Sequence, residues 1–340
     1  KTPIMGVLVG ACVTVLIQSS SATTVMTVSF VDAGLMTLTQ AIGVIMGANI
    51  GTTITGQILA IKVQDYAYLF IIIGVLLSFF GRSKVQKYAG NGLLGFGLLF
   101  VGMQTMESSM SFLRNEKELF LMFSHNPLMG VLAGTLLTLL VQSSAATVGL
   151  TIALGVQGLL PLHAAIPIIL GDNIGTTITA LLASIGQSKN AKRTAIAHSI
   201  FNITGSVVFL CVLPFFARFV QFISPKGNEI DVISRQIANA HTTFNIVCTL
   251  IWLPLIPLMV KIVTTIIRGT EKQRDDGPVS VLENGVIAQP AAALYLVSEE
   301  LEHMAEVGSK LLTALKESFS SDKTQSEAAT EQYKTYRRQA

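Results

Sequence analysis

The sequence predicts an all-α membrane protein made of two related halves, followed by a partial soluble helical tail. Three observations lead to this fold class: an apolar composition, a gapless internal duplication, and polar clusters that interrupt the apolar segments at matching places in both copies. Together they favour an inverted-repeat architecture with two re-entrant hairpins and two broken helices.

The composition separates a lipid-facing part from a water-facing part. Hydrophobic residues make up 51% of the 340 residues and charged residues 13%, against about 25% charged in a typical soluble domain. Residues 1–267 contain 22 charged side chains and residues 268–340 contain 21. We therefore expect a transmembrane domain over residues 1–267, a linker over 268–282 and cytoplasmic helices over 283–340. The net charge of +3 is too small to indicate a nucleic-acid partner.

The duplication is the strongest feature of the chain. Residues 3–55 align without gaps with residues 127–179, and 28 of the 53 positions are identical. The matched polar clusters are Gln18-Ser19-Ser20 with Gln142-Ser143-Ser144, and residues 49–55 with residues 173–179. Apolar composition alone would match leucines and valines, not polar clusters. We expect one repeat over about 1–112 and a second over about 92–267; that a helix over 92–112 opens the second repeat is implied only by the family resemblance given below.

Each copy begins with an apolar run that is too short to cross a bilayer. A spanning helix needs about 20 apolar residues to cross roughly 30 Å of hydrocarbon. Residues 4–17 number 14, so their helix would rise about 21 Å. The polar cluster at Gln18 follows, and the second copy repeats the pattern at Gln142. We therefore expect two re-entrant hairpins with polar tips, which are tolerated at membrane depth only against protein or water.

The next segment of each copy has a polar interruption of its own. Residues 38–61 are interrupted at 47–53, and residues 162–185 at 171–177, by two glycines, an asparagine and two threonines. These residue types favour unwinding over a continuous helix, so we expect two broken spans. Ordinary spans are expected at about 66–81, 92–112, 194–221 and 238–267, which gives six spans and two hairpins.

The number of spans between the hairpins predicts their orientation. Three expected spans separate them, and an odd number gives the two repeats opposite topology. Lysines and arginines on the side of the tail place that side in the cytoplasm. Inverted repeats with paired hairpins and glycine-interrupted helices are typical of secondary transporters with a binding site near the bilayer midplane.

The duplicated clusters offer ligands for an anion and for a cation, without any lysine or arginine. Serines at the hairpin tips can cap the second arms, whose free N–H groups attract anions. The candidate anion ligands are Gln18, Ser19, Ser20, Ser21, Thr23, Gln142, Ser143, Ser144 and Thr147. Carbonyl and side-chain oxygens of the broken spans suit Na⁺, and the candidate cation ligands are Asn49, Thr52, Thr53, Asp172, Asn173, Thr176 and Thr177. A bound cation would offset the anion's charge, which is a physical reason for coupling.

Two further features are interpreted as structural. His198 with Asn202 recurs as His241 with Asn245, and we interpret both pairs as helix-packing residues on one face of each helix. The three cysteines lie in apolar segments without metal-ligand spacing, so we expect no cofactor and no metal besides Na⁺.

These motifs resemble the bacterial branch of the type II sodium/phosphate cotransporter family, known for duplicated Gln-Ser-Ser-Ser and Asn-Ile-Gly-Thr-Thr sequences. Residue 145 is alanine where the full motif has a third serine. The resemblance covers roughly residues 1–267. It implies Na⁺-driven uptake of inorganic phosphate by an elevator-like alternating-access movement, in the inner (plasma) membrane, and no enzymatic activity.

The tail is similar to the start of a PhoU-like helical bundle, which bacterial members of that family often carry. Its apolar stripe consists of Leu294, Val297, Leu301, Met304, Leu311 and Leu315. An alternative is an amphipathic helix that lies on the membrane or dimerises.

Three other functions compete with phosphate symport. A Na⁺-coupled symporter of sulfate or a carboxylate would use the same scaffold. A non-transporting membrane protein that signals phosphate through its tail would leave the duplicated motifs unexplained. An intramembrane serine hydrolase would need a base that the sequence does not place. The expected partners are phosphate, Na⁺ and the lipid bilayer, and the composition also allows a homo-oligomer.

Overall fold

The computed structural model describes residues 3–61, 63–110, 122–123, 125–269, 305–316 and 331–332. Every regular element within these ranges is a helix. The chain divides into two compact units, Lys1–Gly269 and Thr270–Ala340. Most of the predicted PhoU-like tail lies outside the described residues, which in that region include a helix over 305–316. The predicted identity of the tail stays a prediction.

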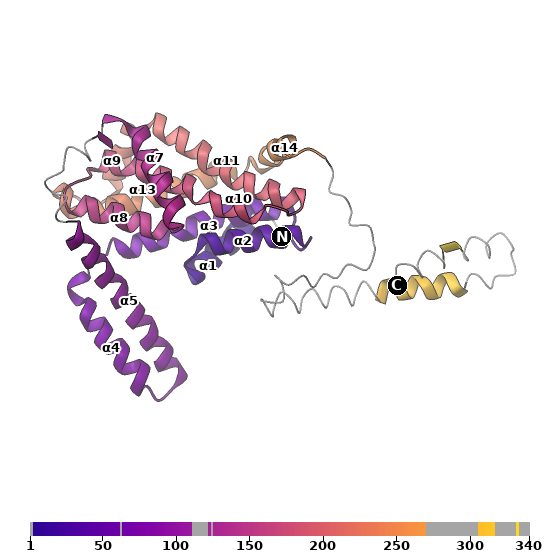
Figure 1. Cartoon of the computed structure of the whole chain (residues 1–340), viewed down its shortest axis with the longest axis horizontal. Coiled ribbons are helices and arrows are strands. Elements are labelled where there is room, and N and C mark those ends of the chain that lie inside the picture. The colour runs from indigo at the N-terminus through magenta and orange to yellow at the C-terminus, as the bar shows by residue number, and fades with distance from the viewer. Residues whose placement is uncertain are drawn as a thin grey trace. The chain divides into compact units, whose positions relative to one another are not determined.

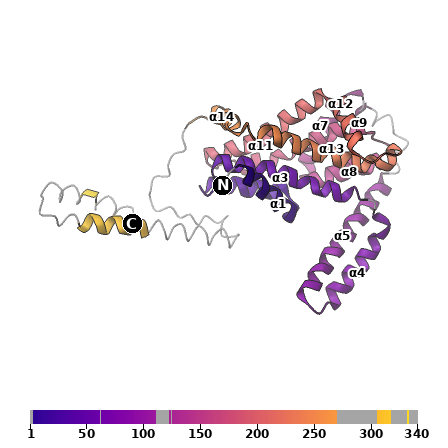
Figure 2. The same ribbon diagram turned by 180° about the vertical axis from the view of Figure 1, so that it is seen from behind.

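The helices of the first unit follow the duplication in order (Figures 1 and 2). The first copy and the hairpin after it contain α1 (Pro3–Ile17), α2 (Ser20–Asp32), α3 (Leu38–Leu59), η1 (Gln64–Tyr66), α4 (Ala67–Phe80) and α5 (Lys84–Ser109). The second copy and the helices after it contain α7 (Pro127–Val141), α8 (Ser144–Val156), α9 (Leu162–Gly175), α10 (Thr177–Ala183), α11 (Lys189–Cys211), α12 (Leu213–Ile223), α13 (Glu229–Trp252) and α14 (Ile256–Ile266).

Both expected hairpins are pairs of short helices. Helices α1 and α7 have 15 residues each, and α2 and α8 have 13. At 1.5 Å per residue the longer arms rise about 22 Å, less than the roughly 30 Å of a hydrocarbon core. The arms meet at Gln18 in the first hairpin and at Gln142 in the second. Their re-entrant placement in a membrane stays a prediction.

The prediction of two broken helices is wrong for the first copy, and in the second copy the helix is interrupted only at Thr176, between α9 and α10. Helix α3 is continuous over 22 residues and runs through positions 47–53. Helices α9 and α10 adjoin through Thr176, whose φ of −58° and ψ of −26° are helical, so Leu162–Ala183 forms one candidate span of 22 residues.

Close helix packing explains why the glycines do not unwind these helices. A Cβ atom added to Gly47 would overlap the Val7 carbonyl oxygen of α1, and one added to Gly171 would overlap the Val131 carbonyl oxygen of α7. Small residues at such positions let two helix backbones approach closely in a membrane. The glycines therefore pair α3 with α1 and α9 with α7.

The structure also corrects the predicted spans. By length and composition, three helical segments among the described residues can cross a membrane, namely α3, Leu162–Ala183 and α11, and there is a fourth if α13 and α14 count as one span bent by 85°. The span predicted over 194–221 is confirmed only as far as Cys211, where α11 ends, and the span predicted over 238–267 is bent after Trp252, where α13 ends. Pro214 and Pro254 follow these ends, and proline cannot donate the backbone hydrogen bond that would continue a helix. The described parts of the spans predicted over 66–81 and 92–112 do not have the length and composition of a membrane span.

The central helices bring the two copies together. Helices α11 and α13 pack against both α3 and α9, while α2 packs on α11 and α8 packs on α13. The α4–α5 hairpin projects away from this group (Figure 1) and reaches it through contacts between α5 and α8. As a result, the tips of both short hairpins lie beside the motif helices α3 and α9.

Candidate functional site

The two hairpin tips have the same local geometry. Gln18 and Gln142 have positive φ values of 58° and 54°, and no other non-glycine residue in the described ranges does. The next serine caps the second arm in each case. Ser19 Oγ accepts a hydrogen bond from the Ala22 N–H at 3.2 Å, and Ser143 Oγ accepts one from the Ala146 N–H at 3.3 Å. The predicted capping of the second arms by tip serines is confirmed.

A buried threonine pair joins the two arms of each hairpin. Thr14 Oγ1 lies 3.0 Å from Thr23 Oγ1, and Thr138 Oγ1 lies 2.8 Å from Thr147 Oγ1. Thr23 and Thr147 also bond to the carbonyl oxygens of the capping serines. These two threonines were predicted to bind the anion, but the structure places them inside the hairpins.

A small polar cavity lies where the two tips meet. Its volume is about 60 Å³, and it is lined by Gln18, Ser19, Ser20, Ser21, Thr52, Thr55, Gln142, Ser143, Ser144 and Ala145. The lining residues include no lysine or arginine. The volume suits a compact ion, since sites for drug-sized molecules occupy about 300–1,000 Å³. Seven of the nine predicted anion ligands therefore come together at one place.

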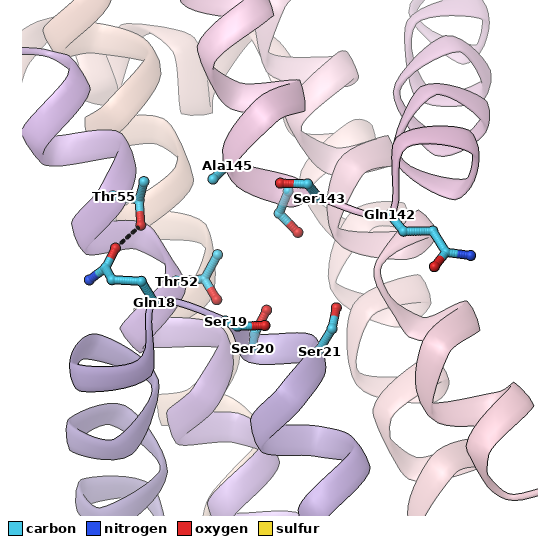
Figure 3. A pocket seen from close by; sticks show the side chains of 10 residues that line it. Gln18, Ser19, Ser20, Ser21, Thr52, Thr55, Gln142, Ser143 and Ala145 are labelled. Carbon is cyan, nitrogen blue, oxygen red and sulfur yellow. Dashed lines mark hydrogen bonds between the residues drawn. The ribbon is translucent and has the colours of Figure 1, made fainter. Parts of the chain in front are cut away.

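The side chains around the cavity differ in direction (Figure 3). Ser143 of the second tip faces Ser19, Ser20 and Ser21 of the first tip, whereas the Gln142 amide points away from the serines. The Gln18 amide is held by Thr55 of α3, whose Oγ1 donates to Gln18 Oε1 at 2.7 Å.

Most of the predicted cation ligands lie beside the cavity rather than in its lining. Thr52 lines it, while Asn49 and Thr53 are buried on α3, Asn173 on α9 and Thr177 at the start of α10. Within this group, Asn49 contacts His198 and Asn173 contacts Asn245. Thr53 donates to the Ile50 carbonyl of its own helix, and Thr177 donates to the Ile174 carbonyl at the end of α9.

The acid of the second copy is buried and only half satisfied. Asp172 has no exposed surface, and its Oδ1 accepts a hydrogen bond from Thr138 Oγ1 at 2.8 Å. Its Oδ2 has no hydrogen-bond partner among the described residues. One helical turn along, Thr176 Oγ1 lies 2.6 Å from Ser144 Oγ of the hairpin tip. A carboxylate oxygen without a donor is suited to a cation, because a bare buried charge is costly.

Sequence reasoning missed two residues of the site. Thr55 lines the cavity and holds Gln18, and Thr138 bonds to both Asp172 and Thr147. Thr138 could have been found from the sequence, because it is identical to Thr14 at the offset of the duplication. Thr55 ends the second matched cluster, where its identity with Thr179 was visible but its contact with Gln18 was not.

Comparisons with known proteins identify the family of this chain. A family model described as Na⁺/Pi-cotransporter matches residues 1–108 and 110–238. The uncharacterized protein YqeW of Bacillus subtilis is 31% identical over 66% of this chain and 73% of its own length. No solved structure shows significant similarity.

Two relatives carry functional names. YjbB of Escherichia coli K12, named for inorganic phosphate export, is 29% identical over 61% of this chain and 38% of its own length. Human sodium-dependent phosphate transport protein 2B is 51% identical over 18% of this chain and 9% of its own length. The chain thus spans well under half of these two relatives, whose names describe transporters and not enzymes. The family model covers most of the transmembrane unit, and the chain belongs to the Na⁺/Pi-cotransporter family.

Proposed function

We propose that this chain is a phosphate symporter driven by Na⁺, with phosphate bound between the two hairpin tips and Na⁺ bound beside Asp172. The observation that carries the proposal is the meeting of both duplicated tips at one small cavity without a basic side chain.

The phosphate half of the proposal depends on hydrogen-bond donors. The first N–H groups of a helix have no partner within the helix, and a helix N-terminus favours negative charge. Helices α2 and α8 both begin at the cavity, and their tip serines add hydroxyl donors. Two N-termini with several hydroxyls match a compact oxyanion that has acceptors on all sides.

The cation half depends on Asp172. Its Oδ2 is buried without a hydrogen-bond partner, and no described lysine or arginine bonds to the carboxylate. Na⁺ beside this oxygen would balance the buried charge, and nearby hydroxyl oxygens such as that of Thr176 are suitable further ligands.

A direct contact connects the two half-sites. Ser144 lines the phosphate cavity and its hydroxyl lies 2.6 Å from that of Thr176, which follows Asp172 by one turn. A cation at Asp172 would orient Thr176, and through it Ser144, and would also offset the charge of phosphate. Each ligand should therefore raise the affinity of the other by the same factor.

The direction of transport follows from the coupling. A Na⁺ symporter moves phosphate along the Na⁺ gradient, which in most cells means uptake. Export, for which YjbB is named, requires reversed gradients, exchange of phosphate for Na⁺, or transport without Na⁺, and a test of this chain has to separate these cases.

Uptake into proteoliposomes tests the proposal. We expect labelled phosphate to accumulate when a Na⁺ gradient points inward, and not when choline replaces Na⁺ or when only a proton gradient is present. Sulfate and succinate in parallel samples test the competing symporters. Phosphate uptake that is equal in Na⁺ and choline would contradict coupling, and preferential uptake of sulfate or succinate would contradict the substrate.

A further inference from the structure

Two buried polar stripes on α11 and α13 face the motif helices. Each stripe has a histidine, an asparagine and a hydroxyl residue at intervals of four, and the two stripes are related by a constant offset of 43 residues. They consist of His198, Asn202 and Ser206 on α11, and His241, Asn245 and Thr249 on α13. All six side chains are buried, with at most 4% of their surface exposed. Side chains four apart lie on the same helix face.

The stripes contact equivalent asparagines in non-equivalent ways. Asn49 of α3 and Asn173 of α9 occupy the same position in the duplication. Asn49 Oδ1 lies 3.2 Å from His198 Nε2, the first position of the α11 stripe. Asn173 Oδ1 instead accepts a hydrogen bond at 3.2 Å from Asn245 Nδ2, the second position of the α13 stripe.

The other asparagine and histidine of the two stripes make no hydrogen bond to the motif asparagines. Asn202 bonds through Nδ2 to the backbone of its own helix, and its Oδ1 has no partner among the described residues. The His241 ring makes no hydrogen bond within the described part of the chain, and its Nδ1 is buried. Buried polar atoms without partners are rare in folded proteins, and both stripes contain them, because His198 Nδ1 and Asn245 Oδ1 also have no partner among the described residues.

We infer that the two stripes position the motif asparagines in alternation during transport. In the state described here, Asn49 pairs with His198 and Asn173 pairs with Asn245. In the opposite-facing state the pairing is exchanged, so that Asn49 pairs with Asn202 and Asn173 pairs with His241. The inference rests on the proposed transport function and concerns how its two states are held.

The exchange is geometrically modest. The two partners in a stripe are four residues apart, about 6 Å along a helix. A shift of this size between packed helices is a known form of switching between two discrete arrangements. Because the two halves are repeats, the inference has each half adopt the pairing that the other half had: Asn49 changes from a histidine to an asparagine partner while Asn173 changes from an asparagine to a histidine partner.

Four alanine variants test the exchange through their effect on sidedness. His198→Ala and Asn245→Ala each remove a contact of the described state, whereas Asn202→Ala and His241→Ala each remove a contact of the opposite state. Every variant carries Ala145→Cys as a reporter in the cavity, with the three native cysteines replaced by alanine. The measurement is the ratio of labelling rates by a membrane-impermeant maleimide from the two sides of oriented vesicles.

The expected result is a grouping across the helices. One lost hydrogen bond should change the ratio about 2- to 10-fold, in one direction for the variants at 198 and 245 and in the other for those at 202 and 241. The double variant His198→Ala/His241→Ala should return the ratio towards that of the parent. Ser199→Ala is the matched control, because the Ser199 hydroxyl bonds to the backbone of its own helix.

Other groupings would overturn the inference. The inference is wrong if the variants at 198 and 202 shift the labelling ratio in one direction and those at 241 and 245 in the other, or if no variant shifts it. Either result would mean that these side chains contribute only to helix packing. Leucine at the same four positions retains volume and removes the polar groups, so it gives a second test should an alanine variant fail to fold. The labelling ratio is measured without substrate and therefore tests only the exchange of partners. The proposed function is tested separately by uptake, and it is refuted if the wild-type protein shows no Na⁺-dependent uptake of phosphate.

Discussion

The two short hairpins, α1–α2 and α7–α8, share their local hydrogen bonds and differ in the helix that lies beside each of them. Both have a glutamine in the left-handed region, a capping serine and a buried threonine pair between the arms. Beside the second hairpin, α9 carries Asp172, whereas α3, beside the first hairpin, has Ala48 at the equivalent position. At the tip of the first hairpin, Gln18 accepts a hydrogen bond from Thr55 of α3. At the tip of the second hairpin, Ser144 bonds to Thr176.

This comparison separates two roles. The shared features produce two helix N-termini at one cavity, which suits an anion held symmetrically between the repeats. The acid occurs in one repeat only, so the strongest cation site should belong to the second repeat. On the proposed function, the duplicated features correspond to the anion site and the unequal residue at position 172 corresponds to the cation site.

The largest expected effect is that of Asp172→Ala on Na⁺ binding, because this substitution gives the second repeat the alanine that the first repeat has at position 48. Removing one member of a buried charge pair typically costs about 3–5 kcal/mol. Asp172→Ala should therefore weaken Na⁺ binding about 100-fold or more, measured as the Na⁺ dependence of phosphate uptake and by isothermal titration. Asp65→Ala, at an exposed position outside the cavity, is the control and should retain the wild-type Na⁺ response. Unchanged Na⁺ dependence in Asp172→Ala would end the assignment of the cation to the second repeat.

A smaller effect is expected at the tip serines, and it distinguishes the two tips. Ser20→Ala and Ser144→Ala should each weaken phosphate binding about 10- to 150-fold, because a hydrogen bond to a charged ligand contributes about 1.5–3 kcal/mol. Only Ser144→Ala should also alter the Na⁺ response, since Ser144 bonds to Thr176.

Titration of phosphate at several Na⁺ concentrations measures both effects. Ser29→Ala is the matched control on the same helix as Ser20, because the Ser29 hydroxyl bonds to its own helix and the second repeat has Ala153 at that position. Wild-type phosphate affinity in both tip variants would exclude the serines from the site.

The smallest effect should be the same in both repeats. Gly47→Ala and Gly171→Ala each place a methyl group against a carbonyl oxygen of the neighbouring helix, and overpacking of this kind costs about 1–3 kcal/mol. We expect similar decreases in the thermal unfolding temperature of the detergent-solubilised protein. Gly92→Ala on α5 is the control, because no heavy atom lies within 4 Å of its added Cβ. If both motif variants unfold like wild type, close packing of α1 on α3 and of α7 on α9 is wrong.

The same glycines show where prediction from sequence failed. Glycines four apart with an asparagine and threonines have low helix propensity, and on that basis we expected unwinding at 47–53 and 171–177. In the structure the motif asparagines make contacts that the sequence does not reveal, Asn49 with His198 and Asn173 with Asn245. Close packing of the glycines then outweighs their low propensity, and the helices continue.

The sequence by itself determined the duplication, the hairpin tips with their serine caps, and the absence of lysine and arginine from the site, because these depend on spacing and residue type along the chain. Only the tertiary structure decided which predicted ligands share a cavity. It moved Thr23 and Thr147 into the hairpins, brought in Thr55, and left one oxygen of Asp172 without a partner. The physical reason is that hydrogen-bond partners 30 to 180 residues apart are chosen by how the helices pack, and packing is a property of the whole fold.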